Sequence, residues 1–370
     1  MTDTIDIPAT SPRFVSLDFM RGLIMVLLAL ESTGLYEHLE EQTRGTVAAT
    51  IVGQFFHHPW HGLYFWDLIQ PAFMFIAGTA MAFSLHRQQQ RGVPWSVSFR
   101  KILKRCGWLF FWGVLNYAVK GDGRLSFELW NVLTQLSFTT LLAFLIFRWS
   151  YTWQILICIF LLLLTEGLYR LSSIPGFDQP FTDQHNFGNY TDLLLMNKIN
   201  RGGWVAINCI PTAVHTIAGA MVGKLVLGKL RRVQVVVIAG ILCLTAGYLL
   251  DFAGITPIIK RIATSSFTLA SLGWCLLAIA VIYWWIDLRN HKKGLAFFTI
   301  VGMNSLFIYL FFEIVGARWF NEYIGHITNG LMNLAGIWEP VKAIVTSLII
   351  FSLEWYLCYF LYKKKVFFKL

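Results

Sequence analysis

Three histidines and one aspartate form a dense group of titratable side chains in an otherwise apolar stretch, HHPWHGLYFWDLIQPAFMFIAG (residues 57–78). The histidines are His57, His58 and His61, and Asp67 follows inside the apolar part. An ionisable group at membrane depth is costly and marks a functional site by default. A carboxylate bound to one imidazole nitrogen fixes the tautomer and leaves the other nitrogen as a base. We therefore expect a histidine–aspartate pair, although the pattern leaves open which histidine takes part.

A metal site is the alternative for these histidines. His57 and His61 have the i, i+4 spacing of a helical metal-binding pair. Pro59, which lies between them, disfavours helical geometry at the preceding residue and removes one backbone donor. No third ligand of suitable type follows nearby in the sequence. We predict no metal at this site.

The composition indicates a membrane protein. Of the 370 residues, 56% are hydrophobic and 14% are charged, whereas soluble domains carry about 25% charged residues. The net charge of +10 would suggest a nucleic-acid partner in a soluble protein. In a membrane protein it reflects the Lys and Arg that collect in cytoplasmic loops. We therefore expect the lipid bilayer, and no nucleic acid, as the partner.

Ten apolar segments are long enough to cross a hydrocarbon core of about 30 Å. They predict an all-α fold, a polytopic helix bundle of about ten transmembrane helices, which forms a single domain over residues 1–370. The segments lie near residues 19–36, 63–86, 103–119, 130–147, 151–170, 206–227, 234–253, 267–286, 295–315 and 341–362. Two long connections, 37–62 and 171–205, each contain one predicted interfacial helix.

The basic residues predict the orientation of this bundle. With the amino terminus inside, cytoplasmic segments hold two thirds of the 30 lysines and arginines. Because cytoplasmic loops are enriched in these residues, both termini are predicted to be cytoplasmic. Residues 1–13 lack the basic region and cleavage site of a signal peptide, so we expect the first span to be retained. The histidine group then lies on the far side of the membrane.

A basic run at residues 87–105 falls on the cytoplasmic side of the predicted bundle. Such a run is first of all what this topology requires. A sharper hypothesis is that it binds the phosphates of a nucleotide-bearing donor. The residues in question are Arg100, Lys101, Lys104 and Arg105.

Three further polar side chains fall within predicted spans. Glu31, near the outer end of the first span, contacts either a neighbouring helix or a substrate amine. His215 lies in mid-span beside Gly219 and Gly223, whose GxxxG spacing is typical of close helix contacts. It is either a satisfied core residue or part of a tunnel. Asn304 either stabilises helix packing or donates a hydrogen bond to a reacting group.

Parts of the sequence resemble one known family. Three stretches carry the resemblance, namely SLDFMRG (16–22), HHPWHGL (57–63) with Asp67-Leu68-Ile69 and Pro71, and GMNS (302–305) with Tyr309. They resemble the LD-x-x-RG opening, the H-x-x-W-x-G-x-x-x-x-D-L-x-x-P block and the late GMNS-x-x-x-Y span of the heparan-α-glucosaminide N-acetyltransferase family and its bacterial NagX-like relatives. The stretches occur in the family's order and frame nearly the whole chain.

The resemblance implies an acyltransferase that moves acetyl from cytosolic acetyl-CoA to an amino sugar or related glycan across the membrane. It assigns the active-site histidine to His57, as base or acyl acceptor, and the orienting carboxylate to Asp67. The family's asparagine late in the first span is replaced around Glu31–Ser32, which bears on the acceptor. The expected substrate contacts are Glu31, His58, Trp60, His61 and Asn304. The expected acetyl-CoA contacts are Arg100, Lys101, Lys104, Arg105 and His215.

This interpretation places the protein in a bacterial inner membrane, with the active-site mouth facing the periplasm, and leaves a homodimer open. The alternative is a secondary transporter for a sugar or related small molecule, in which Glu31, Asp67 and His215 form a proton or substrate path. An inverted repeat with paired broken helices would indicate a transporter, and the sequence shows no obvious one. A non-catalytic assembly or sensor subunit is a third possibility and predicts no donor binding.

Overall fold

The computed structural model describes residues 14–118, 126–228 and 233–368, and its regular structure is helical throughout these ranges. Residues 1–13, for which we predict no signal peptide, lie outside the described residues. Each of the ten predicted segments coincides with a helix or with a run of helices. These are α1 (Val15–Ser32), α4 (Ile69–Gln90), α5 (Trp95–Ala118), α6 (Val132–Leu145), α7 (Tyr151–Arg170), α9 (Cys209–Leu227), α10 (Val233–Phe252), α11 (Ser265–Tyr283), α12 (Ala296–Met303) with α13 (Ser305–Phe311), and α15 (Glu339–Lys363).

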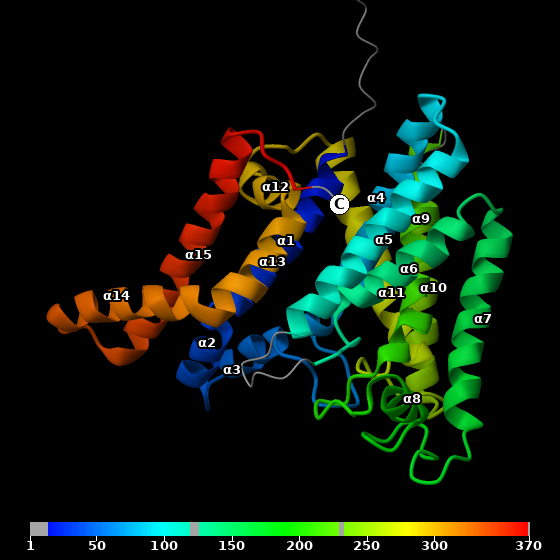
Figure 1. The fold of residues 1–370 in the computed structure, drawn as a ribbon, viewed down its shortest axis with the longest axis horizontal. Helices are drawn as coiled ribbons and strands as arrows, with labels where there is room; N and C mark the ends of the chain where they lie inside the picture. The colour runs from blue at the N-terminus through cyan, green and yellow to red at the C-terminus, as the bar shows by residue number, and fades with distance from the viewer. Residues whose placement is uncertain (1–13, 119–125, 229–232, 369–370) are drawn as a thin grey trace, which may run out of the picture.

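Shorter helices cap or extend this bundle. Helices are present where the two interfacial helices are predicted, as α3 (Ala48–Val52) and α8 (Phe187–Met196), and α2 (Leu35–Thr43) precedes α3. Their position at a membrane interface stays a prediction. In Figure 1, α2, α3 and α8 gather at one end of the bundle, opposite the beginning of α1 and the end of α15. The remaining pieces are the 3-10 turns η1 (Gly53–Phe55), η2 (Phe65–Leu68) and η3 (Ala206–Asn208), the π-helical turns η4 (Trp284–Leu288) and η5 (Phe312–Phe320), and α14 (Asn321–Leu334).

Within the described ranges, six helical runs are long and apolar enough to cross a membrane, so the chain is an integral membrane protein. A seventh is possible if α12 and the run from α13 to α14, which are bent by 77°, form one span. The prediction of about ten spans is therefore not confirmed. The six runs are Phe65–Gln90, Tyr151–Arg170, Ala206–Leu227, Val233–Phe252, Ser265–Leu288 and Glu339–Lys363.

Charge, length and one break explain why the other four predicted spans are not among these six. Helix α1 carries Asp18, Arg21 and Glu31, and the first half of α5 is basic. Helix α6 has 14 residues, which is about 21 Å of helix and shorter than a hydrocarbon core. The predicted segment 295–315 also differs, because the helix breaks at Asn304 and continues through η5 into α14.

Helices α4 and α9 pack closely along a seam of glycines. A Cβ added to Gly219 would lie 1.9 Å from the carbonyl oxygen of Phe75, and one added to Gly78 would lie 1.9 Å from that of Thr216. A Cβ on Gly223 would lie 2.6 Å from that of Ala82. Small residues allow such close backbone approach in membrane helices, as the GxxxG spacing predicts.

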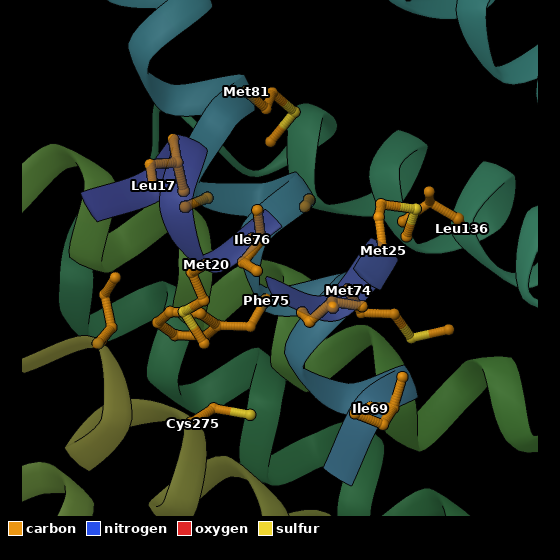
Figure 2. Packing of buried hydrophobic residues seen from close by; sticks show 14 of the residues in the cluster. Leu17, Met20, Met25, Ile69, Met74, Phe75, Ile76, Met81, Leu136 and Cys275 are labelled. Atoms are coloured by element: carbon orange, nitrogen blue, oxygen red, sulfur yellow. The ribbon is translucent and has the colours of Figure 1, made fainter. Parts of the chain in front are cut away.

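The apolar core continues from this seam toward α1 and α11. Figure 2 shows the packing of its side chains, which include Met20 of α1, Phe75 of α4 and Cys275 of α11. Met25, Met74 and Phe75 have no exposed surface. This packed centre holds α1 and α4 in place, and these two helices position the polar groups at the α8 end.

Candidate active site

Asp67 is fixed by the first turn of its own span. Residues 56–64 are not helical, as Pro59 predicts, and η2 begins at Phe65. The backbone N–H of Tyr64 donates to Asp67 Oδ2 over 2.9 Å, while the Asp67 N–H donates to the Tyr64 carbonyl over 3.1 Å. This reciprocal cap orients the carboxylate back toward residues 56–64, which we call the histidine loop.

The Asp67 carboxylate has no exposed surface and is surrounded by donors. Its Oδ1 lies 3.0 Å from His57 Nδ1 and 3.7 Å from the Nζ of Lys260. Its Oδ2 accepts from the backbone N–H of Tyr64 and from that of His58, the latter over 3.2 Å. A buried charge is tolerated when it is paired and hydrogen-bonded in this way. The structure thus brings His57 and Asp67 together, while their catalytic role stays a prediction.

Lys260, in the connection between α10 and α11, is the third member of this group. Its Nζ lies 3.0 Å from His57 Nδ1 and 5.3 Å from the ring centre of Trp204. The side chain is only 6% exposed. The N–H of Gly62 donates to the carbonyl of Ile258 over 2.8 Å. The histidine loop is therefore bonded directly to the α10–α11 connection that carries Lys260.

Burial and charge set the protonation of the group. Burial, with a further effect of Lys260, lowers the pKa of His57 below its ordinary value, although Asp67 opposes this shift. Burial also lowers the pKa of Lys260 to about 8, against the attraction of Asp67 and Glu31. Near pH 7, His57 is therefore neutral and most Lys260 side chains are charged. Nδ1 holds one proton at most, so it either donates to Asp67 or accepts from Lys260. The first tautomer leaves Nε2 as a base.

The His57 ring and Lys260 border a cavity of about 340 Å³ that reaches between α1, α4, α5 and η5. Glu31 in its wall accepts a hydrogen bond from Trp66 Nε1 over 3.1 Å. Carboxylates and aromatic rings contribute much of its lining, and groups of both kinds can bind a cation. Its polar and aromatic lining residues are Glu31, His57, Trp66, Gln70, Phe73, Tyr117, Glu128, Trp130, Asn131, Asn200, Trp204, Lys260, Tyr309 and Glu313.

The other outer substrate contacts that we predicted do not line this cavity. Trp60 Nε1 donates to the Phe181 carbonyl over 2.8 Å, and the indole packs on the loop around α8. His61 Nε2 lies 2.6 Å from Asp251 Oδ1. The His58 ring packs against Tyr64, and its Nδ1 has no partner in the described ranges. These three side chains stabilise residues 56–64 through their contacts. The backbone N–H of His58 donates to Asp67 Oδ2.

Asn304 and His215 do not line the cavity, and the substrate and donor contacts expected of them stay predictions. Asn304 Nδ2 donates to the Val366 carbonyl over 3.2 Å, and its Oδ1 accepts from the Phe368 N–H over 3.0 Å, so the side chain binds the carboxy-terminal segment. His215 has no exposed surface, and its Nε2 lies 2.9 Å from Ser271 Oγ. It is therefore a core residue with hydrogen-bond partners, one of the two alternatives that the sequence left open for this position.

The predicted donor-binding residues lie on α5 near the end opposite α8. Arg100, Lys101 and Lys104 are exposed, and Arg105 is half-buried. None of the four lines the polar cleft of about 520 Å³ between the end of α4, the start of α5 and the link from α6 to α7. The basic side chains in that cleft are Arg148 and Lys224, and its aromatic rings are those of Trp95, Phe147 and Trp149.

Sequence reasoning missed Lys260, Trp204 and Glu313. One signal was available for Lys260. The pair Lys260-Arg261 falls in a short connection on the predicted outer side, where the positive-inside rule disfavours basic residues. A lysine that stays there against the topological trend is a candidate for a specific charge partner. Glu313 is an ionisable residue in the predicted span 295–315, which is itself a signal of a functional site, whereas Trp204 carries no comparable signal.

No family model matches this chain, and no curated protein matches it. The chemistry of the site therefore rests on its geometry. A neutral imidazole with a buried carboxylate on one nitrogen, beside a cavity, can accept a proton from a bound nucleophile or carry an acyl group. Within the described residues, no group of three or more His, Cys, Asp and Glu side chains is placed to hold a metal ion.

Proposed function

We propose that the protein is a membrane acyltransferase that moves an acetyl group from acetyl-CoA to the amine of an amino sugar or related glycan. One observation carries the proposal. The fully buried Asp67 contacts His57 Nδ1 at 3.0 Å, and the His57 ring borders a polar cavity inside a helix bundle. This is the geometry by which a carboxylate orients an imidazole base.

In the proposed reaction, the neutral acceptor amine attacks the thioester carbonyl of the donor. His57 Nε2 takes the proton that the amine loses as the C–N bond forms. When the C–S bond breaks, the same proton passes to the coenzyme A thiolate. The Lys260 ammonium, 3.0 Å from His57 Nδ1, supplies positive charge near the tetrahedral oxyanion. An acetyl-histidine intermediate is the covalent variant of this mechanism.

The cavity favours a cationic sugar as the acceptor. Glu31, Glu128 and Glu313 line it together with Trp130 and Trp204. Carboxylates attract the ammonium form of the acceptor. Its first proton passes to one of these carboxylates and leaves the neutral amine, and His57 takes the second proton as the C–N bond forms. Aromatic rings pack against the apolar faces of sugar rings. As in other small-molecule sites, a few polar groups then fix the orientation of the ligand.

The donor approaches from the opposite end in this proposal. The cleft of Arg148, Lys224 and Trp95, together with the basic face of α5, supplies phosphate contacts and a stacking surface for its nucleotide. Arg105 and Tyr117 lie twelve residues apart on α5, which corresponds to about 18 Å along a helix. The pantetheine arm has to cover this distance to bring the thioester to the cavity.

The finer topology belongs to the same proposal. We infer about ten transmembrane segments, both termini in the cytoplasm and a His57 mouth that faces the periplasm of a bacterial inner membrane. The positive-inside distribution supports this orientation. The placement of α8 opposite the first residues of α1 and the last residues of α15 also agrees with it (Figure 1).

The test is acetyl transfer by the full-length protein in detergent micelles, with acetyl-CoA and a panel of amino sugars. We expect N-acetylated product, and we expect His57→Ala to lower the rate by roughly 10²- to 10⁴-fold. His61→Ala is the matched control because His61 belongs to the same loop but contacts Asp251 outside the cavity. Full turnover by the His57 variant would reject the assignment.

One observation favours the transporter alternative. The bent run of α12 and α13–α14 is a broken helix of 77°, and Tyr309 and Glu313 in it line the cavity. Discontinuous helices often form substrate sites in secondary transporters. Uptake of a labelled amino sugar into proteoliposomes that contain no acetyl-CoA would favour this function over acyl transfer.

A further inference from the structure

Glu354 is a buried carboxyl group that the proposed reaction does not use. It lies in α15, a helix long and apolar enough to span the membrane. It is 1% exposed, and neither of its carboxyl oxygens has a hydrogen-bond partner in the described part of the chain. A bare carboxylate in such surroundings costs far more free energy than a neutral or paired one. Glu354 therefore requires a ligand that neutralises it.

A second unpartnered oxygen faces the same place. The Oδ1 of Asn321 has no partner in the described residues, while its Nδ2 donates to the Ser32 carbonyl over 2.7 Å. A Cβ built on Gly316 would lie 3.3 Å from Glu354 Oε1 and 3.4 Å from Asn321 Oδ1. The two acceptors thus border one small space, which exists because residue 316 has no side chain.

We propose that Glu354 is a proton-binding site, in which its carboxylic acid O–H donates to Asn321 Oδ1. One proton then neutralises the carboxylate and partners both Asn321 Oδ1 and one oxygen of Glu354. The amide orientation agrees with this arrangement because the NH₂ group of Asn321 is already used by Ser32.

The charged groups on neighbouring elements do not neutralise Glu354. The titratable group beside it is Cys358, one turn further along α15. The acidic groups of α1 and η5, Glu31 and Glu313, line the cavity, where Glu31 accepts from Trp66 Nε1 and Glu313 accepts from Asn116 Nδ2. The helices packed against α15 are α1, α2, α12 and α14. Their other charged side chains form their own pairs or are at least partly exposed, namely Asp18 with Arg21, Glu322 with His326, and Glu37, His38, Glu40 and Glu41, and α12 carries none. Arg318 of η5 donates to the Asn116 carbonyl over 2.6 Å, Tyr36 donates to the Leu27 carbonyl, and Tyr323 is exposed.

The small number of oxygen ligands at this site, three in all, favours a proton over a metal ion. Hard cations such as Ca²⁺ take six to eight oxygen ligands, and Mg²⁺ takes six. The site supplies the Glu354 carboxylate and one amide oxygen. Gly316 also belongs to η5, a π-helical turn, and single π-helical turns recur at functional sites.

The location gives the proton a structural consequence. The Glu354–Asn321 bond joins α15 to the junction of η5 and α14, and Asn321 in turn joins α1 at Ser32. Ser32 follows Glu31, and η5 carries Glu313, so both linked elements form the cavity wall. Loss of the proton would leave two acceptors facing each other behind that wall and loosen it. The proton site does not depend on the proposed acyl transfer.

The test is labelling of the full-length protein in micelles with dicyclohexylcarbodiimide, which reacts with protonated carboxyl groups in apolar surroundings. We expect mass spectrometry to locate the adduct on Glu354 near pH 7, and we expect labelling to fall as the pH is raised. Glu354→Gln abolishes the adduct, whereas Glu322→Gln, an exposed carboxyl on α14, leaves it unchanged. Protection by sodium chloride at constant pH, relative to choline chloride, would assign the site to a cation and overturn the proposal.

Infrared spectroscopy gives a second measurement that does not depend on reagent access. The wild-type protein should show the carbonyl band of a protonated carboxyl group that is missing from Glu354→Gln. In Asn321→Leu, which removes the acceptor, the same band should move to the higher frequency of a carboxylic acid without a hydrogen bond. Identical spectra for the wild type and Glu354→Gln would overturn the proposal.

Discussion

His57 and His215 are both set in apolar sequence, yet their surroundings differ in kind. His57 lies on a loop between two buried charges, Asp67 and Lys260, and its ring borders a cavity. His215 lies inside α9, where Ser271 Oγ and the Thr212 carbonyl contact its two ring nitrogens and no surface is exposed. Neutral partners that occupy both nitrogens hold a ring in place, whereas a charged partner on one nitrogen leaves the other for chemistry.

The comparison shows what makes a polar residue in a membrane sequence a candidate for function. The free-energy cost of placing a histidine in apolar sequence does not distinguish the two residues, because each ring has polar partners that offset this cost. The difference is a spare ring nitrogen beside space for a ligand. Four variants test this distinction, and we describe them from the largest expected effect to the smallest.

Asp67→Asn should have the largest effect. An asparagine can still accept the N–H groups of Tyr64 and His58 at one oxygen, but it no longer favours the tautomer with a proton on His57 Nδ1. We expect kcat for acetyl transfer to fall by roughly 10²- to 10⁴-fold, while the protein still folds. Steady-state kinetics measure the first quantity and gel filtration the second. Unchanged kcat would remove Asp67 from the mechanism.

Glu31→Gln should weaken acceptor binding and leave chemistry nearly intact. Glutamine keeps an oxygen for the Trp66 indole N–H but removes a negative charge from the cavity. We expect KM for a cationic amino sugar to rise about tenfold, which is about 1.4 kcal/mol, with a much smaller change in kcat. Glu37→Gln is the control because Glu37 is a nearby exposed acid. Equal changes in both variants would contradict a direct role of Glu31.

Lys260→Met should shift the pH profile of kcat/KM. His57 acts as a base only when neutral, so activity falls as the pH drops through its pKa. Lys260 lowers that pKa, and without the lysine it should rise. The acidic limb of the profile therefore moves to higher pH in the variant. Any limb near pH 8 that reports Lys260 itself should also disappear. An acidic limb at the wild-type pH would separate Lys260 from the titration of His57.

His215→Gln should have the smallest effect on activity. Its ring is enclosed between α9 and α11, so the substitution disturbs packing and two buried hydrogen bonds. We expect a loss of about 1–3 kcal/mol in stability, measured by thermal unfolding in micelles, with KM for acetyl-CoA unchanged. A selective rise in that KM would restore the predicted donor contact and remove the contrast with His57.

Local sequence pattern accounts for much of the fold. Long apolar runs, the proline in the histidine loop and the glycine spacing of α9 each act over a few residues, and the corresponding features are present in the structure. The bend after Met303 and the helix α14 were not predictable in the same way. Both are linked to residues distant in the chain. Asn304 bonds to Val366 and Phe368, and Asn321, the first residue of α14, bonds to Ser32.

The sequence by itself determined the membrane class, the helical segments and the presence of a carboxylate near a histidine cluster, because hydrophobicity and short spacings are properties of neighbouring residues. Only the tertiary structure decided which polar groups meet. It joined Lys260 to His57 across 203 positions, turned Trp60 and His61 away from the cavity, and enclosed His215. Such pairings depend on how the α10–α11 connection folds onto the histidine loop, and no local pattern encodes that contact.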